Sequence, residues 1–193
     1  MTLSARFEEA LTFAARLHKN QIRKGTAIPY ISHLLAVASI ALEHGASEDE
    51  AIAALLHDAA EDQGGKATLS EIRHRFGDSV AEIVEGCTDA WAIPKPSWRK
   101  RKEAYVAHLR DASASVRLVS AADKLHNAQT ILRDYRVLSE SLWKRFSGGR
   151  DGTLWYYRSL VEALRTPGPS LLVEELEGVV SEIERLASKG DRD

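Results

Sequence analysis

The sequence predicts an all-α fold. Apolar residues recur at helical spacing in one segment after another, as at Phe7, Leu11 and Ala14. Glycine and proline separate these segments, and no stretch alternates apolar and polar residues with a period of two over a useful length. The chain has 193 residues, of which 44% are hydrophobic and 28% charged, which is typical of a globular protein with a sizeable core.

The predicted helices follow one another with short interruptions. Ser4 is expected to cap the first helix and Ser47 the third, because serine side chains accept hydrogen bonds from the first free amides of a helix. Gly45 and Gly64 are expected to end the second and third. The expected helical ranges are about 5–20, 30–44, 48–61, 70–76, 79–90, 97–110, 115–137, 153–164 and 171–187.

Composition excludes several classes of protein. The formal net charge is −2, so no global field attracts nucleic acid or an anionic membrane. The single cysteine, Cys87, allows no intramolecular disulfide and indicates a reducing compartment. The first residues lack an apolar signal core, and no apolar run reaches the ~18 residues that span a bilayer. We expect a cytoplasmic protein that binds neither membrane nor nucleic acid.

One short basic run allows three interpretations. Lys95 and residues 99–102 lie close to Trp91 and Trp98. In a nearly neutral chain, such a run most often forms a solvated helix face. The alternatives are a surface for stacking nucleic-acid bases and the rim of a pocket that attracts a polyphosphate.

The residues with the clearest chemical signal are His57, Asp58, Glu61 and Asp62. They are crowded into one helical segment, where residues four apart share a strip of surface. Carboxylates held so close together repel one another unless a cation compensates them, and a divalent metal does this well. The simpler interpretation is a solvated helix end just before Gly64.

Two distant residues favour the metal. His33 begins an apolar helical segment, and Asp123 interrupts another, where a carboxylate needs a partner. Together with His57 and Asp58 they form a mixed nitrogen and oxygen ligand set. Such a set suits Mn²⁺, Fe²⁺ or Zn²⁺ better than a metal selected by thiolates.

The order His…His-Asp…Asp on helices resembles the HD phosphohydrolase superfamily. The resemblance is closer to the hydrolase domain of the RelA/SpoT-type (p)ppGpp enzymes and their stand-alone small relatives. The motifs that carry it are residues 13–18 with 21–24, 29–33, 54–62, 76–80 with 86–89, and 123–127 with Thr130. They cover about residues 5–160. The resemblance implies an HD-domain helical bundle with a metal site between helices. We expect residues 1–166 to form this domain and residues 167–193 a C-terminal helix and tail packed on it.

The resemblance also implies roles for individual residues. The metal ligands are His33, His57, Asp58 and Asp123, usually with Mn²⁺. The acidic pair Glu61 and Asp62 positions or deprotonates the attacking water. The substrate contacts are Arg23 and Lys24 at the nucleotide and its phosphates, Asn127 and Thr130 at the nucleotide, and Tyr157 on the far side of the pocket. His18 is interpreted as structural, orienting the loop that bears Arg23 and Lys24.

Three positions depart from the family pattern. Leu34 stands where proline usually follows the first ligand histidine, and Ser120 replaces a frequent lysine. Gly25 follows the basic pair where relatives carry serine or aspartate, which bears on nucleotide preference.

The function that the resemblance implies is metal-dependent hydrolysis of a small phosphorylated nucleotide. The 3′-pyrophosphate of the guanosine alarmone ppGpp is the expected target. Alternatives are an adenosine alarmone, the removable phosphate of NADPH, or a metal-bound alarmone sensor without turnover. Intact Glu61 and Asp62 argue against the sensor, because a sensor has no use for them.

Overall fold

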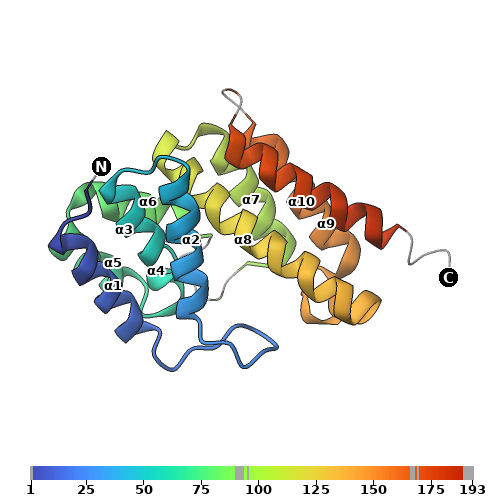
Figure 1. Ribbon diagram of the computed structural model, residues 1–193, viewed down its shortest axis with the longest axis horizontal. Coiled ribbons are helices and arrows are strands. Elements are labelled where there is room, and N and C mark those ends of the chain that lie inside the picture. The colour runs from blue at the N-terminus through green and yellow to red at the C-terminus, as the bar shows by residue number, and fades with distance from the viewer. Residues whose placement is uncertain (1, 90–93, 95, 166–167, 169, 189–193) are drawn as a thin grey trace. The chain divides into compact units, whose positions relative to one another are not determined.

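A computed structural model of the chain describes residues 2–89, 94, 96–165, 168 and 170–188 (Figure 1). Within these ranges the regular elements are ten α-helices and one 3₁₀-helix, with no strand beyond an isolated bridge between Ile22 and Pro29. The all-α prediction is confirmed. The chain forms two compact units: unit 1 contains Met1–Pro96 and Ala112–Asp123, and unit 2 contains Ser97–Asp111 and Lys124–Asp193.

Unit 1 is organised around a buried central helix, α3. Its helices are α1 (Ala5–Leu17), α2 (Ile31–Glu43), α3 (Glu48–Leu56), α4 (Ala59–Asp62), α5 (Lys66–Phe76), α6 (Asp78–Cys87) and the first part of α8 (Ala114–Leu138). Helix α3 packs against α1, α2 and α6. Every side chain from Ala51 to Leu56 is fully buried. A helix that is apolar all round belongs in a core, so its C-terminal end delivers the following residues into the interior of unit 1.

The predicted caps of α1 and α3 are confirmed. The Ser4 side chain accepts a hydrogen bond from the Arg6 amide. Ser47 and Glu50 form a complete capping box, in which each side chain binds the backbone amide of the other residue. The helix ends differ more: α1 ends at Leu17 rather than near residue 20, and the helix expected over 48–61 is interrupted after Leu56.

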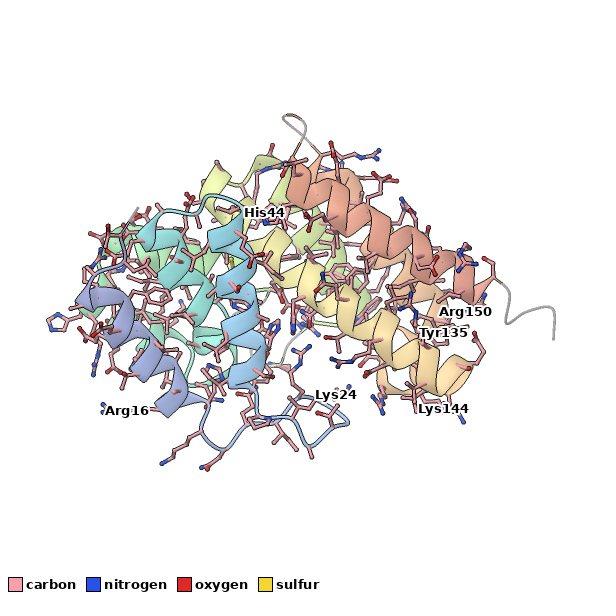
Figure 2. All side chains as sticks on the ribbon, in the orientation of Figure 1. Arg16, Lys24, His44, Tyr135, Lys144 and Arg150 are labelled. Carbon is pink, nitrogen blue, oxygen red and sulfur yellow. The ribbon has the colours of Figure 1, made fainter. Side chains whose placement is uncertain are left out.

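Unit 2 is a layer of packed helices. It comprises α7 (Trp98–Asp111), the rest of α8, η1 (Ser139–Arg145), α9 (Gly149–Leu164) and α10 (Leu171–Ala187). Helix α9 packs against both α7 and α10. Arg158 on α9 pairs with Glu184 on α10, and the Arg150 guanidinium donates to the Ala187 carbonyl at 2.8 Å, near the end of α10 (Figure 2). The expected domain boundary at 166/167 lies outside the described residues and stays a prediction.

The basic run on α7 is partly packed within unit 2. The Arg99 guanidinium lies 3.3 Å from the centre of the Trp155 ring, and Lys102 Nζ lies 5.0 Å from that of Tyr156. Cation–π contacts of this kind favour a structural use of these side chains over a fully solvated face. Trp91 and Lys95 lie outside the described residues. Among the helices that the structure describes, none has the combination of length and hydropathy needed to cross a membrane.

Candidate metal centre and acidic pair

His57 and Asp58 lie at the interruption between α3 and α4. On a continuous helix, side chains of adjacent residues point about 100° apart and do not face each other. Here His57 Nε2 lies only 3.0 Å from Asp58 Oδ2. The sequence predicts an unbroken helix over 48–61, so this prediction is wrong at residues 57 and 58. The break matters for the chemistry of the site, because it lets the neighbouring side chains of His57 and Asp58 meet.

The structure brings His33 and Asp123 to the same point. His33, on the first turn of α2, places Nε2 at 3.5 Å from Asp58 Oδ2 and 3.2 Å from Asp123 Oδ1. Asp123 Oδ1 is 3.7 Å from His57 Nε2. The donor atoms of His33, His57 and Asp58 all lie within 4.8 Å of one another. All four residues predicted as metal ligands, which we call the cluster, thus come together inside unit 1. Three of them are buried: His33 at 1%, His57 at 2% and Asp123 at 5% exposure.

The tautomer of His57 fits a metal ligand. Its Nδ1 lies 2.8 Å from the Ala54 carbonyl oxygen, which can only accept, so Nδ1 carries the proton. When the ring is neutral, Nε2 therefore bears the lone pair, and it faces the carboxylates. This buried atom makes no hydrogen bond. A histidine held by a carbonyl on one nitrogen and open on the other is the usual arrangement of a metal-binding imidazole. These residues therefore fit a divalent cation.

The electrostatics of the cluster favour positive charge. Burial by itself would lower the pKa of His57, but the charges of Asp58 and Asp123 outweigh it and hold that pKa well above its ordinary value. Burial opposes ionisation of Asp58 too, yet the charge of His57 and the neighbouring His33 ring keep the pKa of Asp58 well below normal. Two carboxylates beside two imidazoles thus attract a cation, whether a proton or a metal ion.

Tyr30 is a functional neighbour that the sequence reasoning missed. Its hydroxyl donates a 2.6 Å hydrogen bond to Asp58 Oδ2. Its ring packs edge-on against His33 and stacks on His18. Burial and the charge of Asp58 raise the pKa of Tyr30 far above its ordinary value, so the hydroxyl stays a donor. Its place in the motif at residues 29–33 was the available signal.

Glu61 and Asp62 have partners of their own, apart from the cluster. The Asp89 backbone amide donates to Glu61 Oε2 at 3.2 Å, and the Gln21 side-chain amide donates to Asp62 Oδ2 at 2.7 Å. Neither carboxylate belongs to the group of converging donor atoms among the described residues. Asp89 and Gln21 therefore hold these two carboxylates from two different segments of unit 1.

The predicted phosphate-binding pair lies on the loop between α1 and α2, which Figure 2 shows with Lys24 labelled. The Arg23 amide donates to the Ile28 carbonyl at 2.8 Å and the Tyr30 amide to that of Gln21 at 2.9 Å, which closes the loop into a hairpin. The Arg23 guanidinium lies 5.7 Å from the centre of the Tyr30 ring. Arg23 is half-buried and Lys24 is exposed.

Asn127, Thr130 and Tyr157 belong to unit 2. Thr130 donates its hydroxyl hydrogen to the His126 carbonyl at 3.0 Å, one turn back on α8. Tyr157 on α9 is buried beside Tyr156. Their contact with a substrate stays a prediction.

Comparisons with known proteins agree with the architecture. The family model described as the HD domain matches residues 10–154. The chain therefore belongs to the HD-domain family. More particularly, it is homologous to proteins named guanosine-3′,5′-bis(diphosphate) 3′-pyrophosphohydrolase MESH1, and the resemblance inferred from the motifs is confirmed.

The similarity to these proteins is extensive. The protein from Xenopus tropicalis is 42% identical over 138 residues, covering 70% of this chain and 72% of its own length. The human protein is 36% identical over 173 residues, which cover 84% of this chain and 92% of the human protein. A solved structure of a metazoan SpoT ortholog described as hydrolysing ppGpp is 28% identical, with a TM-score of 0.77 over 94% of this chain and 97% of that one.

Proposed function

We propose that this chain is a metal-dependent phosphohydrolase that removes the 3′-pyrophosphate from guanosine-3′,5′-bis(diphosphate). The observation that carries the proposal is the buried convergence of His33, His57, Asp58 and Asp123, close in the chain to a separate pair of carboxylates. Relatives with this printed activity share 36–42% of their residues with the chain over aligned lengths of 138 and 173 residues.

The ligand set supports a borderline divalent ion, and the family resemblance favours Mn²⁺ among these. Two imidazoles and two carboxylates suit a borderline divalent metal better than Ca²⁺, which takes oxygen ligands alone. When bound, the ion supplies a water of lowered pKa and a positive charge that polarises a phosphoryl oxygen. His57, with its tautomer fixed by the Ala54 carbonyl, presents the lone pair that such an ion needs.

The remaining residues handle the proton and the phosphate charge. Glu61 and Asp62 position the attacking water, and one of the two carboxylates accepts its proton. Arg23 and Lys24 neutralise the negative charge of the pyrophosphate. Asn127, Thr130 and Tyr157 contact the nucleoside.

The proposed reaction breaks one bond. The water oxygen bonds to the phosphorus atom attached to the 3′ oxygen, and the bond between that phosphorus and the 3′ oxygen breaks. The 3′ oxygen takes a proton and becomes a hydroxyl. Pyrophosphate leaves whole, and the 5′-diphosphate is untouched.

Phosphorus NMR of the reaction mixture tests this proposal. The purified protein is incubated with Mn²⁺ and, in turn, guanosine and adenosine 3′-pyrophosphates and NADPH. We expect pyrophosphate from the guanosine compound, loss of turnover in chelator, and recovery when Mn²⁺ is restored. Release of single phosphates would identify a phosphatase instead. No release from any member of the panel would favour the sensor.

Variants of the cluster and of the basic pair test the assigned roles. His57→Ala and Asp123→Ala should abolish Mn²⁺ binding and turnover, whereas His74→Ala and Asp111→Ala, the same changes at exposed positions, should not. Full activity of either cluster variant would contradict the metal assignment.

The basic pair is tested by the double change Arg23→Ala/Lys24→Ala. It should raise KM by about tenfold or more, because a charge-assisted hydrogen bond is worth about 1.5–3 kcal/mol. Arg16→Ala/Lys19→Ala, at exposed positions, is its matched control.

A further inference from the structure

Gln21 lies at the centre of a hydrogen-bond network in unit 1. Its side-chain nitrogen is 2.7 Å from Asp62 Oδ2. Its side-chain oxygen is 2.7 Å from His18 Nδ1 and 2.5 Å from the side-chain nitrogen of Gln63. One amide thus connects the start of the loop between α1 and α2 to one member of the acidic pair.

The chemistry of the partners fixes which way the Gln21 amide points. A carboxylate only accepts hydrogen bonds, so the NH₂ group must face Asp62. The oxygen then faces Gln63, whose NH₂ group only donates, and His18, which must carry its proton on Nδ1. Burial lowers the pKa of His18, which keeps the ring neutral. One orientation of Gln21 therefore satisfies all three bonds, and the opposite orientation would set its oxygen against the Asp62 carboxylate.

His18 is itself held in place. It is 2% exposed, and its ring stacks on Tyr30 with the ring centres 5.3 Å apart and the planes 15° from parallel. Tyr30 in turn donates to Asp58. Of the side chains that hold Gln21, His18 is therefore fixed by packing, which is what a precise positioning contact requires.

We propose that Gln21 is a positioning residue that fixes the Asp62 carboxylate for proton transfer, with His18 and Gln63 fixing Gln21. This inference rests on the proposed function and adds to it a residue outside the metal ligands, the acidic pair and the basic pair. Because Arg23 and Lys24 follow Gln21 on the same loop, the loop that holds the phosphate also aligns the acid.

The discriminating variant is Gln21→Glu. Glutamate has the shape of glutamine and keeps an oxygen for His18 and Gln63, but it has no N–H for Asp62 and adds a like charge beside it. We expect kcat to fall by about tenfold or more, with KM and Mn²⁺ affinity within about twofold of the wild-type values. Gln129→Glu, the same change at an exposed position of α8, is the control and should leave kcat unchanged.

Combination with Asp62→Asn separates positioning from a general structural role. The amide that Asp62→Asn introduces can donate to the carboxylate that Gln21→Glu introduces, so the swapped pair restores a hydrogen bond without the repulsion. In the Asp62→Asn background, Gln21→Glu should therefore cause no further fall in kcat. Unchanged kcat in the single variant, a rise in KM alone, a parallel loss of Mn²⁺, or a full further fall in the double variant would each overturn the proposal.

Thermal unfolding of the wild type, the two single variants and the double variant gives a readout independent of turnover. Gln21→Glu should lower the unfolding midpoint, and Asp62→Asn should restore most of that loss. If the wild type hydrolyses none of the nucleotides, the proposed function fails, and this cycle still decides on the Gln21–Asp62 contact. If the shift in unfolding midpoint of the double variant equals the sum of the two single shifts, the two residues do not interact, and the inferred contact is wrong.

Discussion

The Tyr30 hydroxyl donates its hydrogen to Oδ2 of Asp58, and this same oxygen faces both histidines of the cluster. It lies 2.6 Å from Tyr30, 3.0 Å from His57 Nε2 and 3.5 Å from His33 Nε2. A neighbour that binds a ligating carboxylate limits its rotation and orients it toward the metal.

Tyr30→Phe should therefore weaken Mn²⁺ binding by about tenfold or more, because partners of metal ligands typically contribute about 10–100-fold in affinity or activity. Titration of Mn²⁺ followed by calorimetry measures this effect. Tyr135→Phe is the matched control, because Tyr135 also donates to a carboxylate, that of Glu140, within unit 2. Equal Mn²⁺ affinity in the Tyr30 variant and the wild type would refute the role of the hydroxyl.

The acidic pair should affect turnover and not metal binding. Glu61→Gln and Asp62→Asn keep an oxygen that accepts the observed hydrogen bonds from Asp89 and Gln21, but each removes a charge that takes up a proton. We expect turnover to fall by about 10²–10⁴-fold with Mn²⁺ retained. Glu43→Gln and Asp111→Asn, at exposed positions, are the controls. Loss of Mn²⁺ together with activity would show that Glu61 and Asp62 are themselves metal ligands.

His18 should make the protein less stable in mild acid. Burial lowers its folded-state pKa below the ordinary 6.5. As the pH falls below 6.5, the histidine of the unfolded chain takes up a proton before that of the folded chain does. The stabilising contribution of the neutral ring is therefore full above pH 6.5 and is lost as the pH falls to the folded-state pKa. The contribution to the slope is at most about 1.4 kcal/mol per pH unit.

Denaturant unfolding at about pH 7.5 and about pH 5.5, on either side of the ordinary histidine pKa, measures this contribution. His18→Gln keeps an N–H for Gln21 but cannot titrate, so its free energy of unfolding should fall less between the two pH values. His74→Gln, the same change at an exposed site, should follow the wild type. Parallel curves for the wild type and the His18 variant would show that the buried ring does not titrate as inferred.

Gly86→Ala should destabilise unit 1 although it replaces glycine inside a helix. A Cβ at this position would lie 2.5 Å from Val116 Cγ2, where α6 meets the start of α8. Overpacking of a core lowers the free energy of unfolding by about 1–3 kcal/mol. This loss outweighs the gain of up to about 1 kcal/mol that alanine gives over glycine in a helix. Gly178→Ala on α10 meets no atom within 4 Å and should stabilise slightly.

The free energy of unfolding of these variants checks the packing explanation. Adding Val116→Ala to Gly86→Ala should remove most of the clash. The free energy of unfolding should therefore fall less in the double variant than the sum of its decreases in the two single variants. Strict additivity would show that α6 and α8 are not in close contact at Gly86.

The helices and their caps could be predicted because they depend on local chemistry. Serine before a helix supplies the missing acceptor, and the spacing of apolar residues shows which segments bury a face. The ends of the helices were predicted less accurately. The break between Leu56 and Ala59 could not be foreseen, because each residue from 57 to 62 is compatible with a continuous helix and the backbone departs from one only in its tertiary setting.

The same division applies to the site. The sequence by itself determined the candidate residues, since histidines and carboxylates within apolar segments require partners wherever they lie. Only the tertiary structure decided which of them meet. It brought His33 and Asp123, 90 positions apart in the chain, within 3.2 Å of each other, and it placed the Gln21 amide against Asp62. The physical reason is that hydrogen bonds and ion pairs act over a few ångströms, and only the packing of whole helices brings atoms so far apart in the chain within that range.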